Sequence, residues 1–267
     1  MSFVEAYLLG ALAILGLMVL LWLVSLALRN SSIVDIFWGP GFMLVGWLYF
    51  ALTPEGDLFR KVLVTALVTI WGLRLGTHIF IRNHGKCEDY RYQQFRKDAG
   101  QKWWWYSFFK VFFLQGVLMW VISAPLLWAQ ASSGFVAPGP LEFLALALWA
   151  FGFAFEAGGD WQLSRFKADP ANRGKLLDTG LWRYTRHPNY FGDAAQWWAF
   201  YLIALATGAW WTIFSPLIIT TLLMRVSGVA LLERKLKETK PDYREYVEST
   251  NAFFPWFPKK GKQALKS

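Results

Sequence analysis

The side chains best suited to chemistry gather in one short stretch, residues 180–193, which reads Gly-Leu-Trp-Arg-Tyr-Thr-Arg-His-Pro-Asn-Tyr-Phe-Gly-Asp. Guanidinium groups bind phosphates through paired hydrogen bonds, and ionised carboxylates accept hydrogen bonds from hydroxyl or amide groups. The stretch therefore carries the groups needed to hold an anionic nucleotide. The alternative is a basic loop at a membrane edge that sets topology and contacts lipid headgroups. Its polar side chains include Arg183, Tyr184, Arg186, His187, Asn189, Tyr190 and Asp193.

The composition is typical of a membrane protein. The chain has 267 residues, of which 55% are hydrophobic and 19% aromatic, and 17 of them are Trp. Trp is favoured where a membrane meets water, because its ring is apolar and its N–H is a donor. We therefore expect an all-α integral membrane protein in contact with a lipid bilayer. The net charge of +9 indicates basic cytosolic loops, and no nucleic-acid partner is expected.

Metal and disulfide chemistry are not expected. Cys87 is the only cysteine, and the three His residues do not form a metal-binding pair. The glycine-rich phosphate-binding motifs of soluble nucleotide folds do not occur, so helix and loop side chains would have to grip a nucleotide. Residues 1–5 carry no basic segment, so the first apolar run is expected to be a retained span.

Seven apolar runs are expected to cross the membrane, since about 20 residues span its hydrocarbon core. Lys and Arg concentrate after the first, third, fifth and seventh runs, so the positive-inside rule places the N-terminus outside and the C-terminus in the cytosol. We expect one seven-helix domain over residues 1–267, with a basic cytosolic tail at 234–267. The expected spans are Phe3–Leu28, Ile33–Leu52, Leu58–Ile81, Phe108–Ala131, Leu141–Gly158, Ala194–Ala206 and Trp211–Leu232.

Several of these spans carry charged residues, which are costly inside a bilayer and are usually functional. Asp35 lies near the start of the second span, before a Gly-Pro-Gly sequence at 39–41 that should bend the helix. Arg74, His78 and Arg82 follow one another at intervals of four, so they share one face of the third span and its end. The other charged residues of this kind are Glu156, Asp160, Arg225 and Glu233, and all of these polar clusters fall on the expected cytosolic side.

The stretch 181–193 resembles the C-terminal domain of the steroid 5-alpha-reductase superfamily, as do the Leu-Leu-Glu-Arg sequence at 231–234 and the pair Tyr243 and Tyr246. The segments that begin at Asp35 and at Trp71 are similar to its bacterial branch, the DUF1295 group. The resemblance covers most of the chain from residue 33. Its core, Arg-His-Pro-x-Tyr-x-Gly, is shared with sterol double-bond reductases and isoprenylcysteine carboxyl methyltransferases, so it specifies the superfamily more sharply than the reaction.

The resemblance implies an enzyme of the bacterial inner membrane that binds NADPH from the cytosolic side. It would reduce a carbon–carbon double bond conjugated to a ketone, in a hydrophobic substrate such as a 3-oxo-delta-4 steroid. No obligate protein partner is implied. The cofactor would bind mainly to the C-terminal half, about 141–258. The implied ligands are Arg82, Lys86, Asp160, Lys167, Arg173, Lys175, Tyr184, Arg186, His187, Asn189, Tyr190, Asp193, Arg225 and Glu233.

Individual roles follow from the same resemblance. Asn189 and Asp193 match family residues at the nicotinamide and ribose end, and Asp160 matches an acidic cofactor ligand. Lys167 and Lys175 stand where the steroid enzymes use Arg for phosphates, so charge is kept while the paired hydrogen bonds are lost. Arg225 matches a cofactor-binding Arg of the last span.

The group that would bind the ketone departs from the family pattern. The steroid enzymes pair a carboxylate of the second span with a Tyr of the third, and the third span here contains no Tyr. The candidate catalytic residues are therefore Asp35, if protonated, with Arg74 and His78, and Trp38 would contact the substrate in the carboxylate's place. Such a donor would stabilise the developing enolate while hydride reaches the beta carbon.

Two alternatives remain at this point. One is a methyltransferase that uses S-adenosylmethionine, a cofactor without phosphate that would not need so many cations. The other is a non-enzymatic lipid-binding protein, in which Asp160, Asp193 and Arg225 would occupy costly positions without a purpose.

Overall fold

The structure is a computed structural model that describes residues 1–133, 138–226, 229, 233, 236 and 243–259. Every regular element in this part of the chain is a helix, as expected. Four helices are long and apolar enough to cross a membrane, and two shorter helices are apolar as well. The count of seven spans and the orientation of the termini stay predictions. Most of residues 227–242, where the seventh expected span ends, and residues 260–267 of the expected tail lie outside the described residues.

The chain forms two compact units, which are described separately. The first contains Met1–Ala137 and Ile203–Ser215, and the second contains Pro138–Leu202 and Pro216–Ser267. The expected catalytic residues Asp35, Arg74 and His78 belong to the first unit. Most of the expected cofactor ligands belong to the second. The single seven-helix domain stays a prediction.

Helix α1, Phe3–Leu28, has the bounds of the first expected span. Ser2 and Glu5 form a capping box at its start, and it ends at Arg29 in the left-handed region, with φ 51°. Only 22% of its apolar window is buried inside the protein. A helix that is apolar on all sides and largely exposed needs an apolar solvent, so lipid is expected to cover it.

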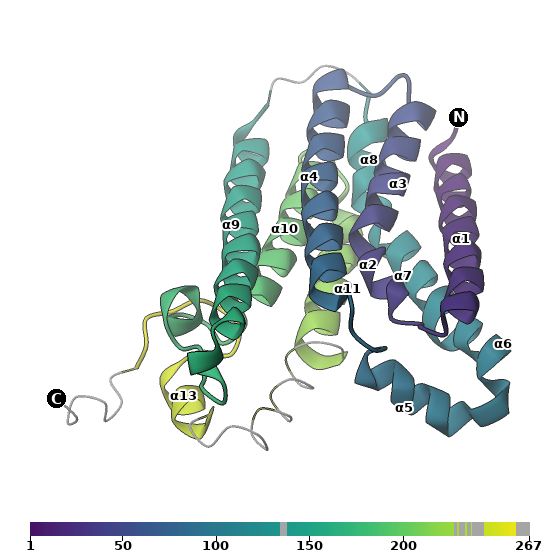
Figure 1. The fold of residues 1–267 in the computed structure, drawn as a ribbon. Coiled ribbons are helices and arrows are strands. Elements are labelled where there is room, and N and C mark those ends of the chain that lie inside the picture. The colour runs from purple at the N-terminus through teal and green to yellow at the C-terminus, as the bar shows by residue number, and fades with distance from the viewer. Residues whose placement is uncertain (134–137, 227–228, 230–232, 234–235, 237–242, 260–267) are drawn as a thin grey trace. The chain divides into compact units, whose positions relative to one another are not determined.

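The second expected span is two helices, α2 at Ile33–Ile36 and α3 at Trp38–Leu52, with a break at Phe37. The break thus comes before the Gly-Pro-Gly sequence that was expected to cause a bend. Pro40 lies in the first turn of α3, where a missing N–H leaves no hydrogen bond unmade. Helix α3 packs against both α1 and α4, Leu58–Asn83, as Figure 1 shows.

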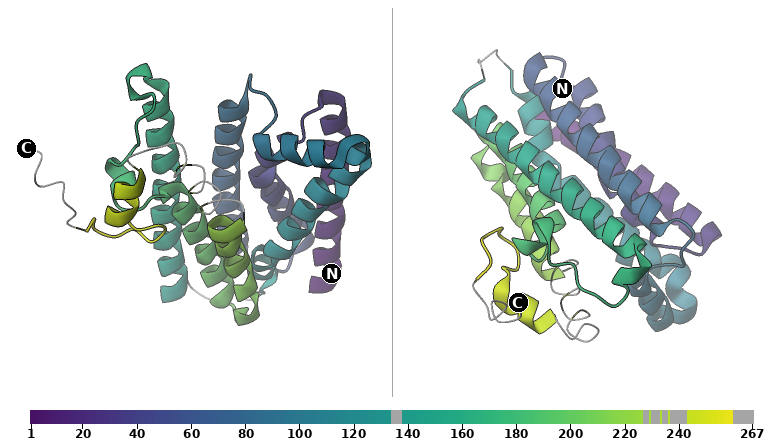
Figure 2. Two further views of the ribbon diagram at one scale, coloured as in Figure 1. Left: turned by 90° about the horizontal axis from the view of Figure 1, so that it is seen from below. Right: turned by 60° about the vertical axis from the view of Figure 1, so that its left-hand side comes forward.

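Residues 90–131 form one helical run that contains a turn at Ser123. The polar connection expected over 82–107 therefore contains α5 and α6, and the fourth expected span is interrupted at Ser123, because Pro125 has no N–H to continue the helix. Figures 1 and 2 show α5 lying crosswise to the long helices of its unit. The elements of the run are α5 (Tyr90–Ala99), η1 (Gly100–Lys102), α6 (Trp103–Ser107), η2 (Phe108–Phe113), α7 (Leu114–Ile122) and α8 (Ala124–Ala131).

Helix α9, Pro140–Ala168, extends ten residues past the end of the fifth expected span at Gly158. Its 29 residues extend about 44 Å, whereas the hydrocarbon core is about 30 Å thick. The segment that contains Asp160 and Lys167 had been expected to be a loop, and it forms the last turns of this helix. The elements that follow are η3 (Pro170–Asn172), η4 (Gly180–Arg183), α10 (Pro188–Leu205), η5 (Trp210–Ile213), α11 (Phe214–Thr221), η6 (Leu222–Val226) and α13 (Tyr243–Ser249).

Candidate functional site

The position of Asp35 depends on a close approach of two helices in the first unit. A Cβ atom on Gly72 would lie 2.7 Å from the carbonyl oxygen of Gly39, so only glycine lets the backbones of α3 and α4 come this near. The same approach brings α2 against α4. The carboxylate of Asp35 is thereby held at the end of α4, the helix that carries Arg74 and His78.

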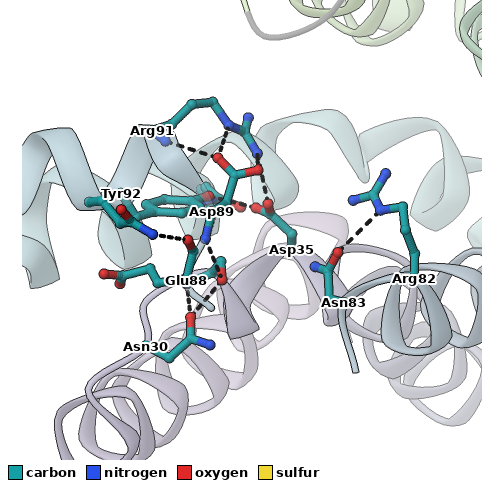
Figure 3. Close-up of polar contacts among 11 residues, drawn as sticks. Asn30, Asp35, Arg82, Asn83, Glu88, Asp89, Arg91 and Tyr92 are labelled. Carbon is teal, nitrogen blue, oxygen red and sulfur yellow. Dashed lines mark hydrogen bonds and ion pairs between the residues drawn. The ribbon is translucent and has the colours of Figure 1, made fainter. Parts of the chain in front are cut away.

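Asp35 is bonded to two side chains of α5 that were not among the expected site residues. Its Oδ1 accepts a hydrogen bond of 2.6 Å from the Tyr92 hydroxyl, and its Oδ2 lies 3.0 Å from Nη2 of Arg91. Figure 3 shows Arg91 bridging Asp35 and Asp89, whose Oδ1 is 2.9 Å from Arg91 Nε. Tyr92 is only 5% exposed and accepts a hydrogen bond of 3.3 Å from Gln115. The result is a buried phenol held against a carboxylate.

A second set of contacts fastens this segment to the turn between α1 and α2. Glu88 accepts hydrogen bonds from the Ser31 backbone at 2.6 Å and from Nη2 of Arg96 at 2.9 Å. The Asp89 N–H donates to the Ser32 hydroxyl at 3.3 Å. Burial alone would raise the pKa of Asp89, but hydrogen bonds from Arg91 and its charge lower that pKa. The carboxylate of Asp89 therefore stays ionised and keeps Arg91 in place.

The other expected residues of this unit lie on α3, on α4 or just after it. Arg74 and His78 are half-buried and share a face, as their spacing predicted. Arg82 and Lys86 are exposed; Arg82 donates to the Asn83 side chain at 3.2 Å, and the Lys86 ammonium donates to the Arg82 carbonyl. Figure 3 shows Arg82 hydrogen-bonded to Asn83 and not to Asp35.

Trp38, the expected substrate contact, is half-buried at the start of α3. It makes an edge-to-face ring contact with Phe42.

Two expected cofactor ligands of the second unit, Arg186 and His187, both bind a third, Glu233. Oε1 of Glu233 lies 2.7 Å from Nη2 and 2.8 Å from Nε of Arg186, and 3.3 Å from Nε2 of His187. Nη1 of Arg186 donates to the carbonyls of Val247 and Thr250 at 3.2 and 2.6 Å. Burial lowers the pKa of His187, so its imidazole is neutral at pH 7. Their contacts favour a structural role for all three, and their binding of a cofactor stays a prediction.

The same loop is tied to the C-terminal segment through its backbone. The Arg186 N–H donates to Asn251 O at 2.9 Å, and the Trp256 N–H donates to Tyr184 O at 3.0 Å. The Thr185 hydroxyl donates to Phe253 O at 2.8 Å, and the hydroxyl of Tyr246 donates to the carbonyl of Trp182. Residues 182–187 and 246–256 therefore fold as one piece.

Helices α9 and α10 meet along a seam of buried carboxylates and amides. Asn189 donates to Asp160 at 2.9 Å, and Gln196 donates to Glu156 at 2.7 Å. A Cβ atom on Gly152 would lie 2.7 Å from the carbonyl oxygen of Gly192, so the backbones touch beside the Gln196–Glu156 pair. The seam brings together two expected cofactor ligands from separate helices. Asp193, also buried, follows Asn189 by one turn on α10.

The remaining expected ligands of the second unit are more accessible. Tyr184 is exposed, and Tyr190 stacks on His187 with ring centroids 5.7 Å apart. Arg225, which was expected to be buried in the seventh span, is exposed in the π-helical η6. Among the described residues no group of three or more His, Cys, Asp or Glu side chains could hold a metal ion. Four of the expected ligands in this unit are exposed cations: Lys167, Arg173, Lys175 and Arg225.

Comparison with known proteins identifies the family. A family model described as a protein of unknown function, DUF1295, matches residues 21–250. The chain belongs to the DUF1295 family. An uncharacterized protein of Schizosaccharomyces pombe is 29% identical over 264 residues, which cover 88% of this chain and 75% of that protein. No solved structure matches the chain.

The match confirms the expected resemblance to the DUF1295 group. The matched residues include both the Asp35–Tyr92 contact and the Asp160–Asn189 contact. The backbone groups of Asn251, Phe253 and Trp256, which hold the loop at 182–187, lie after the end of the match.

One signal in the sequence could have identified Tyr92 as a site residue. A carboxylate at a membrane edge needs a partner, and the polar segment 88–96 supplies the only tyrosines between the third and fourth expected spans, apart from Tyr106.

Proposed function

We propose that this DUF1295 protein is a membrane-embedded, NADPH-dependent reductase of the enone double bond in a hydrophobic substrate, such as a 3-oxo-delta-4 steroid. The proposal is carried by the hydrogen bond between Asn189 and Asp160. The family resemblance assigns both residues to the cofactor, and they lie 29 positions apart on different helices. Their contact supports a common site in the second unit.

The donor set of this unit fits a dinucleotide phosphate. Carboxylates such as Asp160 accept hydrogen bonds from ribose hydroxyls, and the Asn189 amide can pair with a carboxamide. Lys167, Arg173 and Lys175 are exposed beside the end of α9, where their positive charge could bind phosphates. This number of cations fits a cofactor with several phosphates better than it fits S-adenosylmethionine, which has none.

In this proposal, the phenol of Tyr92 binds the carbonyl oxygen of the substrate. NADPH, when bound, supplies a hydride to the beta carbon. The Tyr92 phenol is held by Asp35, which is fixed in turn by Arg91. In the proposal the phenol hydrogen turns from Asp35 to the carbonyl oxygen of the substrate, where it stabilises the enolate, while Asp35 stays ionised against Arg91. A proton then reaches the alpha carbon from water or a side chain. Tyr92 thus does what a tyrosine of the third span does in the steroid enzymes, which is to bind the ketone.

Cofactor binding is the first test. The purified protein should gain thermal stability with NADPH and none with S-adenosylmethionine, because a ligand that binds only the folded state stabilises it. Asn189→Ala and Asp193→Ala should lose the gain. Asp98→Ala, an exposed carboxylate of α5, should keep it and serves as the matched control. Stabilisation by S-adenosylmethionine alone would refute the reductase proposal.

Turnover is the second test. Oxidation of NADPH with a 3-oxo-delta-4 steroid is followed by absorbance, and the reduced steroid is identified by mass. Tyr92→Phe should lower kcat about 100-fold or more, as the loss of one hydrogen-bond donor to a developing oxyanion does, while the Kd for NADPH stays unchanged. If Tyr92→Phe turns over at the wild-type rate, the carbonyl is bound elsewhere, and the Arg74 and His78 variants are the next to measure.

A further inference from the structure

The second unit contains a pocket of about 340 Å³ between the end of α9 and the segment that follows it. None of the cofactor ligands implied by the resemblance lines it. Its most prominent feature is a pair of side chains one turn apart, since the guanidinium carbon of Arg165 lies 5.6 Å from the ring centroid of Trp161. The lining residues are Trp161, Gln162, Arg165, Phe166, Asp169, Asn172, Leu177, Thr179 and Gly180.

The polar groups of this pocket are held in place by the fold. Oε1 of Gln162 accepts from the Leu181 N–H at 3.0 Å, and Gly180, with φ 62°, leaves the space that this side chain fills. Asp169 caps η3 by accepting from the Ala171 N–H at 2.9 Å. Asn172 donates to the carbonyl of Phe166 at 3.1 Å. A ligand would therefore meet side chains that have little freedom left to lose.

The chemistry of the lining suits a flat, nitrogen-containing ring. A broad indole face stacks on any base, and a guanidinium adds a cation–π contact. Amide and carboxylate groups read the amine and ring nitrogens of adenine. The volume is at the low end of ligand pockets, which span roughly 300–1,000 Å³, so it holds one part of a dinucleotide. Arg173 and Lys175, exposed on the segment that forms one wall, supply positive charge for adjoining phosphates.

We propose that this pocket binds the adenine base of the cofactor. Trp161 stacks on the base beside Arg165, and Asp169 accepts a hydrogen bond from the exocyclic amine. This assignment rests on the proposed function and adds to it the end of NADPH that is remote from the nicotinamide. Trp161 and Asp169 become binding residues that the family resemblance did not include.

Stacking is tested by the Kd for NADPH, measured by calorimetry on the purified chain in detergent. Trp161→Ala should weaken binding by about tenfold or more, in line with the measured worth of base stacking, while Trp161→Phe keeps most of the affinity. The matched control is Trp104→Ala, because Trp104 is 60% exposed and Trp161 59%, so both could serve as membrane anchors. An equal effect of the two alanine variants would mean that Trp161 acts only as an anchor, and would overturn the proposal.

Base recognition is tested first on the unaltered protein, which avoids any doubt about folding. The NADPH analogue with hypoxanthine in place of adenine has an oxygen where the amine stood, so it should bind more weakly than NADPH. Asp169→Asn retains the cap of η3 and gains an N–H donor, so it should narrow or reverse this preference. Equal affinity of the wild-type chain for the two dinucleotides would overturn the proposal.

The same measurements separate this pocket from the reductase proposal. If NADPH binds but Trp161→Ala does not alter its Kd, the adenine assignment is wrong and the reductase proposal stands. If S-adenosylmethionine binds in its place, and Trp161→Ala weakens it, the pocket holds adenine but the reductase proposal is wrong. If the wild-type chain binds neither of these adenine-containing cofactors, both proposals are wrong.

Discussion

Tyr92 donates a hydrogen bond of 2.6 Å to Asp35, so a phenol of α5 lies against a carboxylate of α2. The two residues are 57 positions apart, and Arg91 approaches the other oxygen of the same carboxylate at 3.0 Å. This contact does two things in the structure. It fastens the crosswise helix α5 to the bundle of the first unit, and it gives the protein a tyrosine–carboxylate pair that no single span contains.

The coupling between Tyr92 and Asp35 should be measurable as stability. Tyr92→Phe removes the hydroxyl that donates to the carboxylate. Asp35→Asn removes the negative charge that accepts this hydrogen bond. Each single change should cost about 1–3 kcal/mol, and the double variant should cost less than the sum, because the shared hydrogen bond is lost only once. Unfolding of the four chains, followed by circular dichroism in detergent, provides the cycle. Strict additivity would show that the contact contributes nothing.

Arg186 should be more important for stability than for cofactor affinity. Arg186→Met would leave Glu233 without its main partner and strip the carbonyls of Val247 and Thr250 of a donor, at a cost of about 3–5 kcal/mol. Arg183→Met removes an exposed cation of the same loop and is the matched control. The melting temperature and the rate of proteolysis of the C-terminal segment report the difference. A fully stable Arg186→Met chain that no longer binds NADPH would restore Arg186 as a ligand.

Glu233 should make the fold sensitive to acid. Burial alone would raise its pKa, but hydrogen bonds from His187 and Arg186 outweigh burial and lower the pKa from 4.5 to about 2. The folded state thus binds this proton less tightly than the unfolded state does. Ionised Glu233 stabilises the fold fully above pH 4.5, and this contribution is lost as the pH falls from 4.5 towards about 2.

Glu233→Gln separates this effect from general acid unfolding. The variant should have a lower melting temperature than the wild type at neutral pH. This difference in melting temperature should shrink as the pH falls from 4.5 towards about 2. Glu245→Gln, at an exposed position of α13, should show a small gap that does not change with pH. If the difference in melting temperature for Glu233→Gln stays constant down to about pH 2, the ionised carboxylate is not stabilised by its neighbours.

The sequence predicted those features that local composition determines. The bounds of α1 agree with the first expected span, because the length of an apolar run is itself the signal. The bend expected at residues 39–41 occurs slightly earlier, at Phe37, and the break at Ser123 was missed, since a hydropathy pattern does not register a change in helix direction. The extension of α9 past Gly158 was also missed, because its last turns are polar and have the composition of a loop.

Side-chain partners were harder to predict than helices. A buried charge has the same sequence signature whether its partner is a ligand or another residue of the chain. Arg186 and Glu233 were expected to bind a cofactor, and they bind each other across 47 positions. Tyr92 was overlooked for the opposite reason, because it lies in a polar segment expected to be a loop. Only the contact of α2 with α4 and the crosswise course of α5 bring it to Asp35.

The seam between α9 and α10 gives a prediction that links packing to the cofactor site. A Cβ atom on Gly192 would overlap the carbonyl of Gly152 and lie 2.8 Å from Cβ of Glu156. Gly192→Ala should therefore force the helices apart at a cost of about 1–3 kcal/mol. Separation would also stretch the bond from Asn189 to Asp160, so the stabilisation by NADPH should fall even though no expected ligand has been changed.

A matched glycine provides the control for this experiment. A Cβ atom on Gly16, in the middle of α1, would meet no atom within 4 Å. Gly16→Ala should leave NADPH binding unchanged and raise stability slightly, because alanine favours the helix by about 1 kcal/mol over glycine. Melting temperatures with and without NADPH compare the two variants directly. If Gly192→Ala responds to NADPH as the wild type does, the close approach of α9 and α10 is not what positions Asn189, and the cofactor site must tolerate a wider seam.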